Sequence, residues 1–147
     1  MVLDISNIIT GNTLFSLRHG DTIQKAYEVL SIKYIEVNDY DPNHITLIID
    51  DIQMFFNKKL FDFGVIKFWR SGEDIYCLDN KINYQTTLET MRAILDDSNI
   101  SYTENETNKD NQLNLNLENG AVLVFAPYCY AKTWYKLVKI KWGKDWR

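Results

Sequence analysis

The sequence predicts an α+β protein made of two tandem units, each a helix followed by antiparallel strands. The first observation behind this prediction is an internal repeat: the ten residues that begin at Asp21 are similar to the ten that begin at Thr86, a shift of 65 positions. A repeat constrains architecture before any motif is considered, because both copies must form the same supersecondary unit. The second observation is that the match resumes at a shift of 68, where Ile32, Tyr34 and Glu36 return as Ile100, Tyr102 and Glu104.

Each copy opens with a predicted amphipathic helix. Asp21 and Thr86 are placed to cap the two helices, and Gln24 and Glu89 stand three residues further on, where a capping box places its second member. Apolar residues then recur at the spacing of one helical face. Each helix is therefore expected to bury one face against a sheet. The predicted buried stripes are Ile23, Ala26, Tyr27 and Leu30 in the first copy and Leu88, Met91, Ile94 and Leu95 in the second.

About four strands are expected after each helix. The segment that begins Leu113-Asn-Leu-Asn-Leu alternates as an antiparallel strand with one buried face does. An alternative is that two unrelated segments share a pattern common to all helix-and-meander units. The predicted strands are 32–37, 45–50, 52–56 and 60–69, then 100–104, 113–118, 121–125 and 135–142. The predicted units are 1–69 and 86–147, with a connector at 70–85 that holds a short strand at 75–78, all within one compact domain.

Composition excludes several classes of protein. A chain of 147 residues that is 46% hydrophobic and 14% aromatic can bury a sizeable core. No segment approaches the roughly 20 apolar residues of a membrane span, and the N-terminus has Asp4 where a secretion signal carries basic residues. Cys77 and Cys129 stand at no metal-ligand spacing, which favours free thiols in a reducing compartment over a disulfide. We therefore expect a cytoplasmic protein.

Signatures of catalysis and cofactor binding are lacking in the sequence. His19 and His44 lie in predicted loops with no nucleophile pattern beside them, so surface or turn-capping roles are favoured. The six glycines stand apart and form no phosphate loop. We predict no enzyme, no catalytic residue, no metal and no cofactor. An enzyme with a small pocket between the halves stays open, and a cleft that joined either histidine to a carboxylate would favour it.

The two copies differ between their last two strands. Phe56 and Leu60 enclose three residues, whereas Phe125 and Leu137 enclose an aromatic stretch of eleven. Long connections are more often functional than architectural, and Tyr and Trp dominate binding hot spots. The alternative is that these rings fold back and cap the sheet. We predict a partner-binding loop whose candidate residues are Tyr128, Tyr130, Lys132, Trp134 and Tyr135.

Charge is distributed unevenly along the chain. Residues 1–131 contain 10 basic and 19 acidic residues, and residues 132–147 contain six and one. Basic residues interleaved with Trp134, Trp142 and Trp146 could follow a single-stranded nucleic acid. A sequence pI near 5.1 argues against that function. The favoured interpretation is a terminal edge strand, protected by outward lysines, with Val138, Ile140 and Trp142 facing inward.

Acidic residues gather around the first predicted inter-strand loop. The segment that opens with Asp39 and Asp41 resembles the start of a calcium loop, but His44 stands where that loop needs Gly. A solvated acidic face is the commonest explanation of such a run, and the same face could steer a basic protein partner. The partner-binding candidates of this group are Asp39, Asp41, Asp50 and Asp51.

The stretch Leu14-Phe-Ser-Leu-Arg-His-Gly-Asp-Thr22 resembles the opening of small bacterial domains with a Leu-Arg-x-Gly-x-Ser/Thr start, some of which are immunity proteins of toxin systems. The tandem plan is similar to that of the β-lactamase inhibitory protein, which binds an enzyme across two such units. This chain departs from the pattern at Ser31, where Gly commonly follows the helix. The resemblance implies an immunity or inhibitor protein that neutralises a toxin enzyme. The acidic loops would steer a basic toxin domain and the aromatic loop would anchor it.

Overall fold

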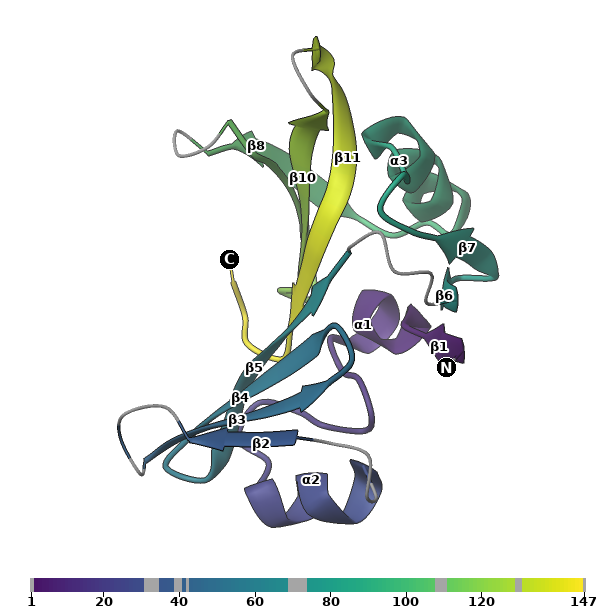
Figure 1. The fold of residues 1–147 in the computed structure, drawn as a ribbon. Helices are drawn as coiled ribbons and strands as arrows, with labels where there is room; N and C mark the ends of the chain where they lie inside the picture. The colour runs from purple at the N-terminus through teal and green to yellow at the C-terminus, as the bar shows by residue number, and fades with distance from the viewer. Residues whose placement is uncertain are drawn as a thin grey trace.

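The computed structural model describes residues 2–30, 35–38, 41, 43–68, 74–107, 111–128 and 131–146. Its centre is an eight-stranded sheet in which every neighbouring pair is antiparallel (Figure 1). The strand order is β2-β3-β4-β5-β11-β10-β9-β8, so the two halves join where β5 pairs with β11. The strands are β2 Ile35–Asn38, β3 His44–Ile49, β4 Ile52–Asn57, β5 Leu60–Lys67, β8 Tyr102–Glu106, β9 Leu113–Leu117, β10 Val122–Tyr128 and β11 Ala131–Trp142.

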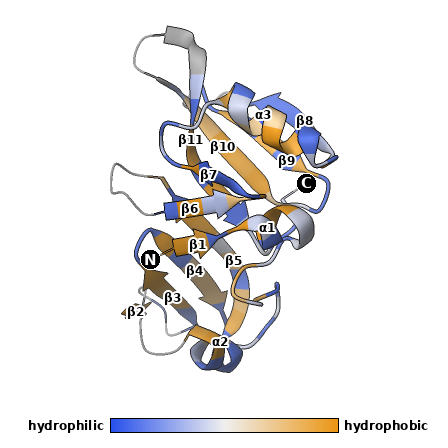
Figure 2. Ribbon diagram, turned by 90° about the vertical axis from the view of Figure 1, so that its right-hand side faces the viewer, coloured by the Kyte–Doolittle hydropathy of each residue, from blue (hydrophilic) through white to orange (hydrophobic). Residues whose placement is uncertain are grey.

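One face of this sheet is covered by the helices and by a second, smaller sheet. In Figure 2, α2 (Ile23–Leu30) lies at one end, α3 (Leu88–Asp97) at the other, and α1 (Ser6–Gly11) between them. The smaller sheet has the order β1-β6-β7, with β1 at Val2–Asp4, β6 at Asp74–Cys77 and β7 at Asn80–Ile82. The predicted α+β class is confirmed, and the antiparallel strands of both halves form one large sheet. None of the helices in the described residues is long and apolar enough to cross a membrane.

Both long helices are capped one residue later than the sequence suggested. Thr22 Oγ1 accepts a hydrogen bond from the backbone N–H of Lys25 at 3.2 Å. Thr87 Oγ1 accepts one from the N–H of Thr90, also at 3.2 Å. A threonine hydroxyl at this position satisfies an N–H group that has no partner inside the helix.

The residues predicted as caps, Asp21 and Thr86, close the preceding turns instead. Asp21 Oδ2 accepts from the backbone N–H of Arg18 at 2.8 Å, and Thr86 Oγ1 accepts from the N–H of Asn83 at 2.9 Å. The capping prediction was therefore wrong by one residue in both places. It failed because Asp and Thr bond neighbouring backbone groups equally well in a turn and at a helix start.

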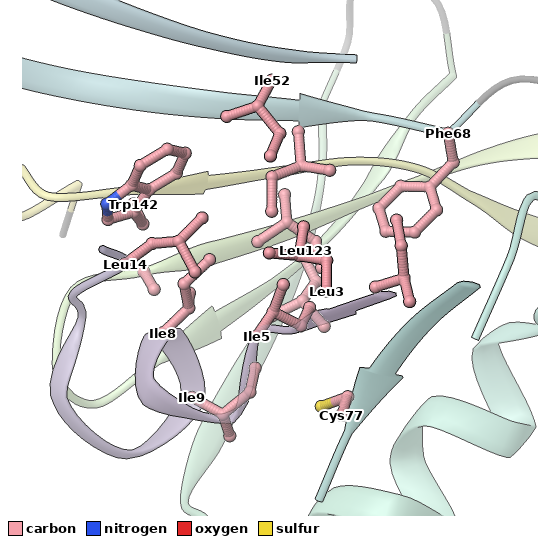
Figure 3. Packing of buried hydrophobic residues seen from close by; sticks show 14 of the residues in the cluster. Leu3, Ile5, Ile8, Ile9, Leu14, Ile52, Phe68, Cys77, Leu123 and Trp142 are labelled. Carbon is pink, nitrogen blue, oxygen red and sulfur yellow. The ribbon is translucent and has the colours of Figure 1, made fainter. Parts of the chain in front are cut away.

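The core lies between the large sheet and its cover. The N-terminal segment, which the sequence analysis left unassigned, fills its middle: β1 pairs in parallel with β6, and α1 follows directly. Ile5, Ile8 and Leu17 are fully buried, and Figure 3 shows Ile5, Ile8 and Leu14 in the same packed cluster as Leu123 and Trp142. Cys77 is buried here as well, and desolvation raises its pKa to about 12. This thiol is the small core hydrophobe that the sequence suggested, whereas Cys129 lies outside the described residues.

The join between β5 and β11 combines a very large and a very small residue. Trp142 pairs with Gly64, and Ile140 pairs with Ile66 two positions further on. A Cβ added at Gly64 would lie 2.1 Å from the Trp142 ring, so only glycine leaves room for that ring. Trp142 and Ile140 are both fully buried, as predicted.

Beyond β11 the chain turns at Gly143 and is held by Asn12, the residue that ends α1. Asn12 Nδ2 donates to the carbonyl oxygens of Lys144 at 3.1 Å and Asn119 at 3.2 Å. Its Oδ1 accepts from the N–H of Gly143 at 2.8 Å. These bonds fix where the C-terminal residues leave the sheet.

Candidate functional site

The side of the large sheet opposite the helices has no covering layer in the described part of the chain, apart from C-terminal residues that reach its centre (Figure 1). We call it the outer face. Residues opposite each other in antiparallel strands share a face, and successive residues alternate. Strand by strand, the outer face comprises Ile35, Val37, His44, Thr46, Ile48, Gln53, Phe55, Asn57, Phe63, Val65, Lys67, Lys139, Lys141, Val124, Val122, Asn114, Asn116, Thr103 and Asn105.

Three aromatic rings form a row at the centre of the outer face. Phe55 of β4 stacks on Phe63 of β5, with ring centroids 4.6 Å apart. Trp146 meets Phe63 edge-on at 5.2 Å, and its backbone N–H donates to the carbonyl of Gly120 at 3.0 Å. Phe55, Phe63 and Trp146 are all half-buried, so each presents part of its ring to solvent.

On one side of the aromatic row the outer face carries exposed aliphatic side chains among polar ones. At the sheet edge in β2, Ile35 is 66% and Val37 36% exposed. Ile48 of β3, opposite Ile35, is half-buried. Exposed apolar side chains that continue into an aromatic cluster are typical of surfaces that bind other proteins.

On the other side of the row the outer face is basic. Lys141 and Lys144 place their ammonium groups over the Trp146 ring, 4.5 and 4.8 Å from its centroid. Lys67 and Lys139 stand opposite each other on β5 and β11. Within the described residues, neither of that pair has an ion-pair partner. Burial lowers the pKa of Lys141, and the nearby charges of Lys139 and Lys144 lower that pKa further.

These lysines do not protect a sheet edge, as the sequence interpretation held. β11 is an internal strand between β5 and β10, so that interpretation is wrong. Val138, predicted to face inward, is half-buried and unpaired at a β-bulge, since Val124 pairs with Lys139 and Phe125 with Leu137. The terminal position of the strand in the sequence was misleading because the N-terminal half of the sheet pairs with it.

Two buried polar atoms on the outer face have no hydrogen-bond partner among the described residues. They are Trp146 Nε1 and Asn114 Oδ1. Buried polar groups in proteins are nearly always paired, and leaving one unpaired costs about 1–3 kcal/mol. Both atoms lie beneath the surface, so a molecule docked on the outer face does not reach them.

The predicted aromatic loop is instead a two-stranded ribbon. β10 continues to Tyr128 and β11 begins at Ala131, and these two residues pair. β9 stops pairing with β10 at Phe125, so the end of the β10–β11 hairpin extends past its neighbour. The loop prediction failed because residues 126–136 show no regular alternation of apolar and polar residues of the kind that predicts a strand.

The structure describes these aromatic candidates unequally. Tyr130 lies outside the described residues, as do the side chains of Tyr128, Lys132 and Trp134. Tyr135 is half-buried and packs against the hydrophobic core. Tyr135 therefore has a structural role, whether or not it also touches a partner.

The acidic candidates do not form one patch. Asp41 lies before β3, 3.4 Å from His44, while Asp50 and Asp51 lie in the turn after β3. Six strand residues separate the two ends, a span of about 20 Å. Asp50 is exposed and Asp51 half-buried, and Asp39 is outside the described residues.

One histidine does approach a carboxylate in a hollow. His19 Nδ1 is 2.8 Å from the backbone oxygen of Asp62 and 3.7 Å from its Oδ1. This is the convergence that would favour an enzyme, but the described lining offers no hydroxyl or thiol for a histidine base to activate. The hollow has a volume of ≈ 380 Å³ and is lined by His19, Gly20, Asn57, Lys58, Leu60, Phe61 and Asp62.

Sequence reasoning missed Phe55 and Phe63 as surface residues. The signal was present in β4, where Phe55 and Phe56 are adjacent, so one ring must face away from the core. Comparison of the chain with protein-family models, with curated proteins and with solved structures found no match.

Proposed function

We propose that this chain is a protein-binding module that acts as an inhibitor or immunity protein and neutralises a toxin enzyme. The observation that carries the proposal is the outer face, a wide sheet surface with an aromatic row, exposed aliphatic side chains and a basic area. Aromatic residues and exposed aliphatic groups on a rigid scaffold are suited to protein recognition, since little conformational entropy is lost on binding.

The β10–β11 ribbon is proposed as a second contact. Its strands include Tyr128, Lys132 and Trp134, and Tyr130 lies between the two strands in the sequence. Beyond Phe125, β10 pairs with β11 alone, while β11 also forms a bridge from Lys136 to Thr87. A ribbon that extends past a sheet can enter a concave site on a partner, which the flat outer face cannot do. If Tyr130 and Trp134 are hot spots, changing both to Ala weakens the complex by more than about 2 kcal/mol.

We also propose that the molecule consists of two tandem copies of one helix-plus-four-strand unit. Four local arrangements support this. Three of them lie at equivalent positions of the two halves. They are the threonine that caps the helix, the residue before it that closes a turn, and the β-bulge after Phe55 or Val124. In addition, Tyr27 donates to Glu36 and Arg92 donates to Glu104, which ties each helix to the edge strand of its own half.

The tandem plan supports the resemblance to the β-lactamase inhibitory protein, which binds an enzyme across two such units. The boundaries that follow are 1–69 and 86–147. The connector 70–85 includes β6, which pairs with β1 of the first unit, so the units are expected to fold as one domain.

The proposal is tested by site-specific photo-crosslinking in the native host. A benzophenone amino acid replaces Phe55 on the outer face or, as control, Val29, which is 43% exposed on α2 at the covered side. We expect a crosslinked protein at position 55 and none at position 29. The captured protein is then purified and assayed, and an inhibitor must suppress its enzymatic activity. Equal crosslinking at both positions, or full activity of the captured protein in the complex, contradicts the proposal.

Single-stranded nucleic-acid binding is a second candidate, favoured by the lysines around Trp146. It predicts retention of oligonucleotides on a filter at low salt and their release as salt rises, since phosphate contacts release counterions. Absence of retention at low salt eliminates this candidate.

A further inference from the structure

We propose that the outer face docks an acidic protein surface, with Lys67, Lys139, Lys141 and Lys144 as the groups that recognise its carboxylates. This inference rests on the proposed protein-binding function and names the chemistry of the partner. It differs from the sequence prediction of a basic partner steered by acidic loops.

The first support is the separation of charge between the two sides of the sheet. The protein has 20 acidic residues and a net charge of −4. Even so, the described strand positions of the outer face include no Asp or Glu, and the C-terminal segment that reaches this face adds one acidic residue, Asp145. Strand glutamates such as Glu36 and Glu104 occupy the opposite side, where they bond to the helices. A basic surface within an acidic molecule is complementary to an acidic partner.

The second support is the way the lysines are held. Lys141 and Lys144 rest over the Trp146 ring, and Lys144 also lies 5.9 Å from the centroid of Phe63. A cation over a ring loses less side-chain freedom when it binds an anion, because its position is already restricted. Lys141 is partly desolvated, so a carboxylate there would interact through a medium of lower dielectric than water.

The third support is the polarity of the remaining groups near the lysines. Trp146 Nε1 is a buried donor without a partner in the described residues. Lys67 and Lys139 face each other as like charges without an acidic group to separate them. The accessible groups here are the lysine ammonium groups, which are donors, so a surface rich in carboxylates satisfies them together. Trp146 Nε1 and the acceptor Asn114 Oδ1 are buried and do not contact such a surface.

The geometry favours a protein over a nucleic acid as the source of the negative charge. Base stacking needs a free ring face, yet Phe55 stacks on Phe63 and two ammonium groups lie over Trp146. The basic area is confined to the centre of the sheet. A nucleic-acid strand that left it would meet an acidic molecule, whereas the carboxylates of a folded partner can be confined to one patch.

The experiment uses the full chain, isotope-labelled and observed by NMR, with three probes at low and at moderate salt. The probes are poly-L-glutamate, poly-L-lysine and a single-stranded oligo-dT. Three variants are compared with the unsubstituted chain: the pair Lys67→Glu with Lys139→Glu, the milder pair Lys67→Gln with Lys139→Gln, and Lys59→Glu as control. Lys59 is exposed in the β4–β5 turn, away from the basic area. Unfolding curves establish that each variant is folded.

We expect poly-L-glutamate to shift the Trp146 indole signal and the amide signals of β5 and β11. The Glu pair should weaken the binding of poly-L-glutamate by about tenfold or more, because the new carboxylates repel those of the probe. The Gln pair should weaken it by less, and Lys59→Glu by little. Tighter binding of oligo-dT with a steep salt dependence, or shifts caused by poly-L-lysine instead, overturns the inference. So does poly-L-glutamate binding that the Glu pair leaves intact.

The two proposals fail in distinguishable ways. A partner that crosslinks at position 55 and has a basic contact surface leaves the binding function standing and removes this inference. If the chain binds poly-L-glutamate but no partner crosslinks at position 55, the preference of the outer face for acidic groups is retained and the inhibitor function is rejected.

Discussion

The two halves of the large sheet share the hydrogen bonds that cap and anchor their helices. They differ in the residue that each contributes to the β5–β11 join, Gly64 or Trp142, and in the length of their last hairpins. In both halves a helix is tied to a glutamate on the edge strand, Glu36 in one and Glu104 in the other. The hairpin of the first half closes at Lys58 and Lys59, whose φ angles are 53° and 63°, while that of the second continues to Tyr128. The comparison teaches that the two halves share the bonds that tie each helix to its edge strand and differ in the ends of their last hairpins.

The join offers the largest expected effect. Gly64→Ala places its methyl group, at ideal Cβ geometry, 2.1 Å from the Trp142 ring, and this ring is fully buried. Overpacking of this kind costs about 3 kcal/mol of unfolding free energy, at the upper end of the usual range. Urea unfolding measures the loss.

A double substitution shows whether the two residues depend on each other. Trp142→Leu alone is expected to cost about 3 kcal/mol because it leaves a cavity. Combined with Gly64→Ala, the loss should fall short of the sum by more than about 1 kcal/mol, since the methyl group then occupies space the indole has vacated. Ile66→Val, at the neighbouring pair of the same join, should cost about 1 kcal/mol. Strictly additive losses of unfolding free energy would show that glycine at position 64 is not required by the size of the Trp142 ring.

A smaller effect is expected at Asn119, a residue of the second half whose side chain bonds to α1. Its Nδ2 donates to the carbonyls of Ile8 at 3.0 Å and Ile9 at 2.9 Å, and its Oδ1 accepts from the N–H of Ala121 at 3.0 Å. Asn119→Ala removes all three bonds and is expected to cost about 2 kcal/mol. The matched control is Asn116→Ala on the outer face, which should cost about 0.5 kcal/mol. Equal losses would show that α1 does not depend on this side chain.

The sequence predicted the parts of the fold that follow from local pattern. Strands around Leu47, Met54 and Leu115 were expected close to their observed bounds because alternation with a buried face is visible in one segment at a time. The strand β1 and the helix α1 were missed. A three-residue strand has no period to detect, and its partner β6 lies about 70 residues away along the chain.

The candidate site was predicted less well than the fold. The basic residues of β11 and Trp146 were identified from charge and composition, but their setting was wrong because no local signal shows that β5 pairs with the last strand. The acidic residues were grouped by sequence, and β3 separates them. A surface made of side chains from several strands depends on strand order, and strand order is a long-range property.

The smallest expected effect concerns the bond that ties each helix to its edge strand. The hydrogen bond from Arg92 holds the pKa of Glu104 below its ordinary value, so the pair stabilises the folded state above that ordinary pKa and loses its effect as the pH falls through the lowered value. Water screens this partly exposed pair, and Glu104→Gln should cost about 0.5 kcal/mol at neutral pH and less at acidic pH, where the Glu104 carboxylate takes up a proton. Glu36→Gln keeps an oxygen acceptor for the Tyr27 hydroxyl, so it should cost less at neutral pH. Urea unfolding at both pH values measures the Glu104→Gln loss, and an equal loss at both would mean that the carboxylate charge contributes nothing.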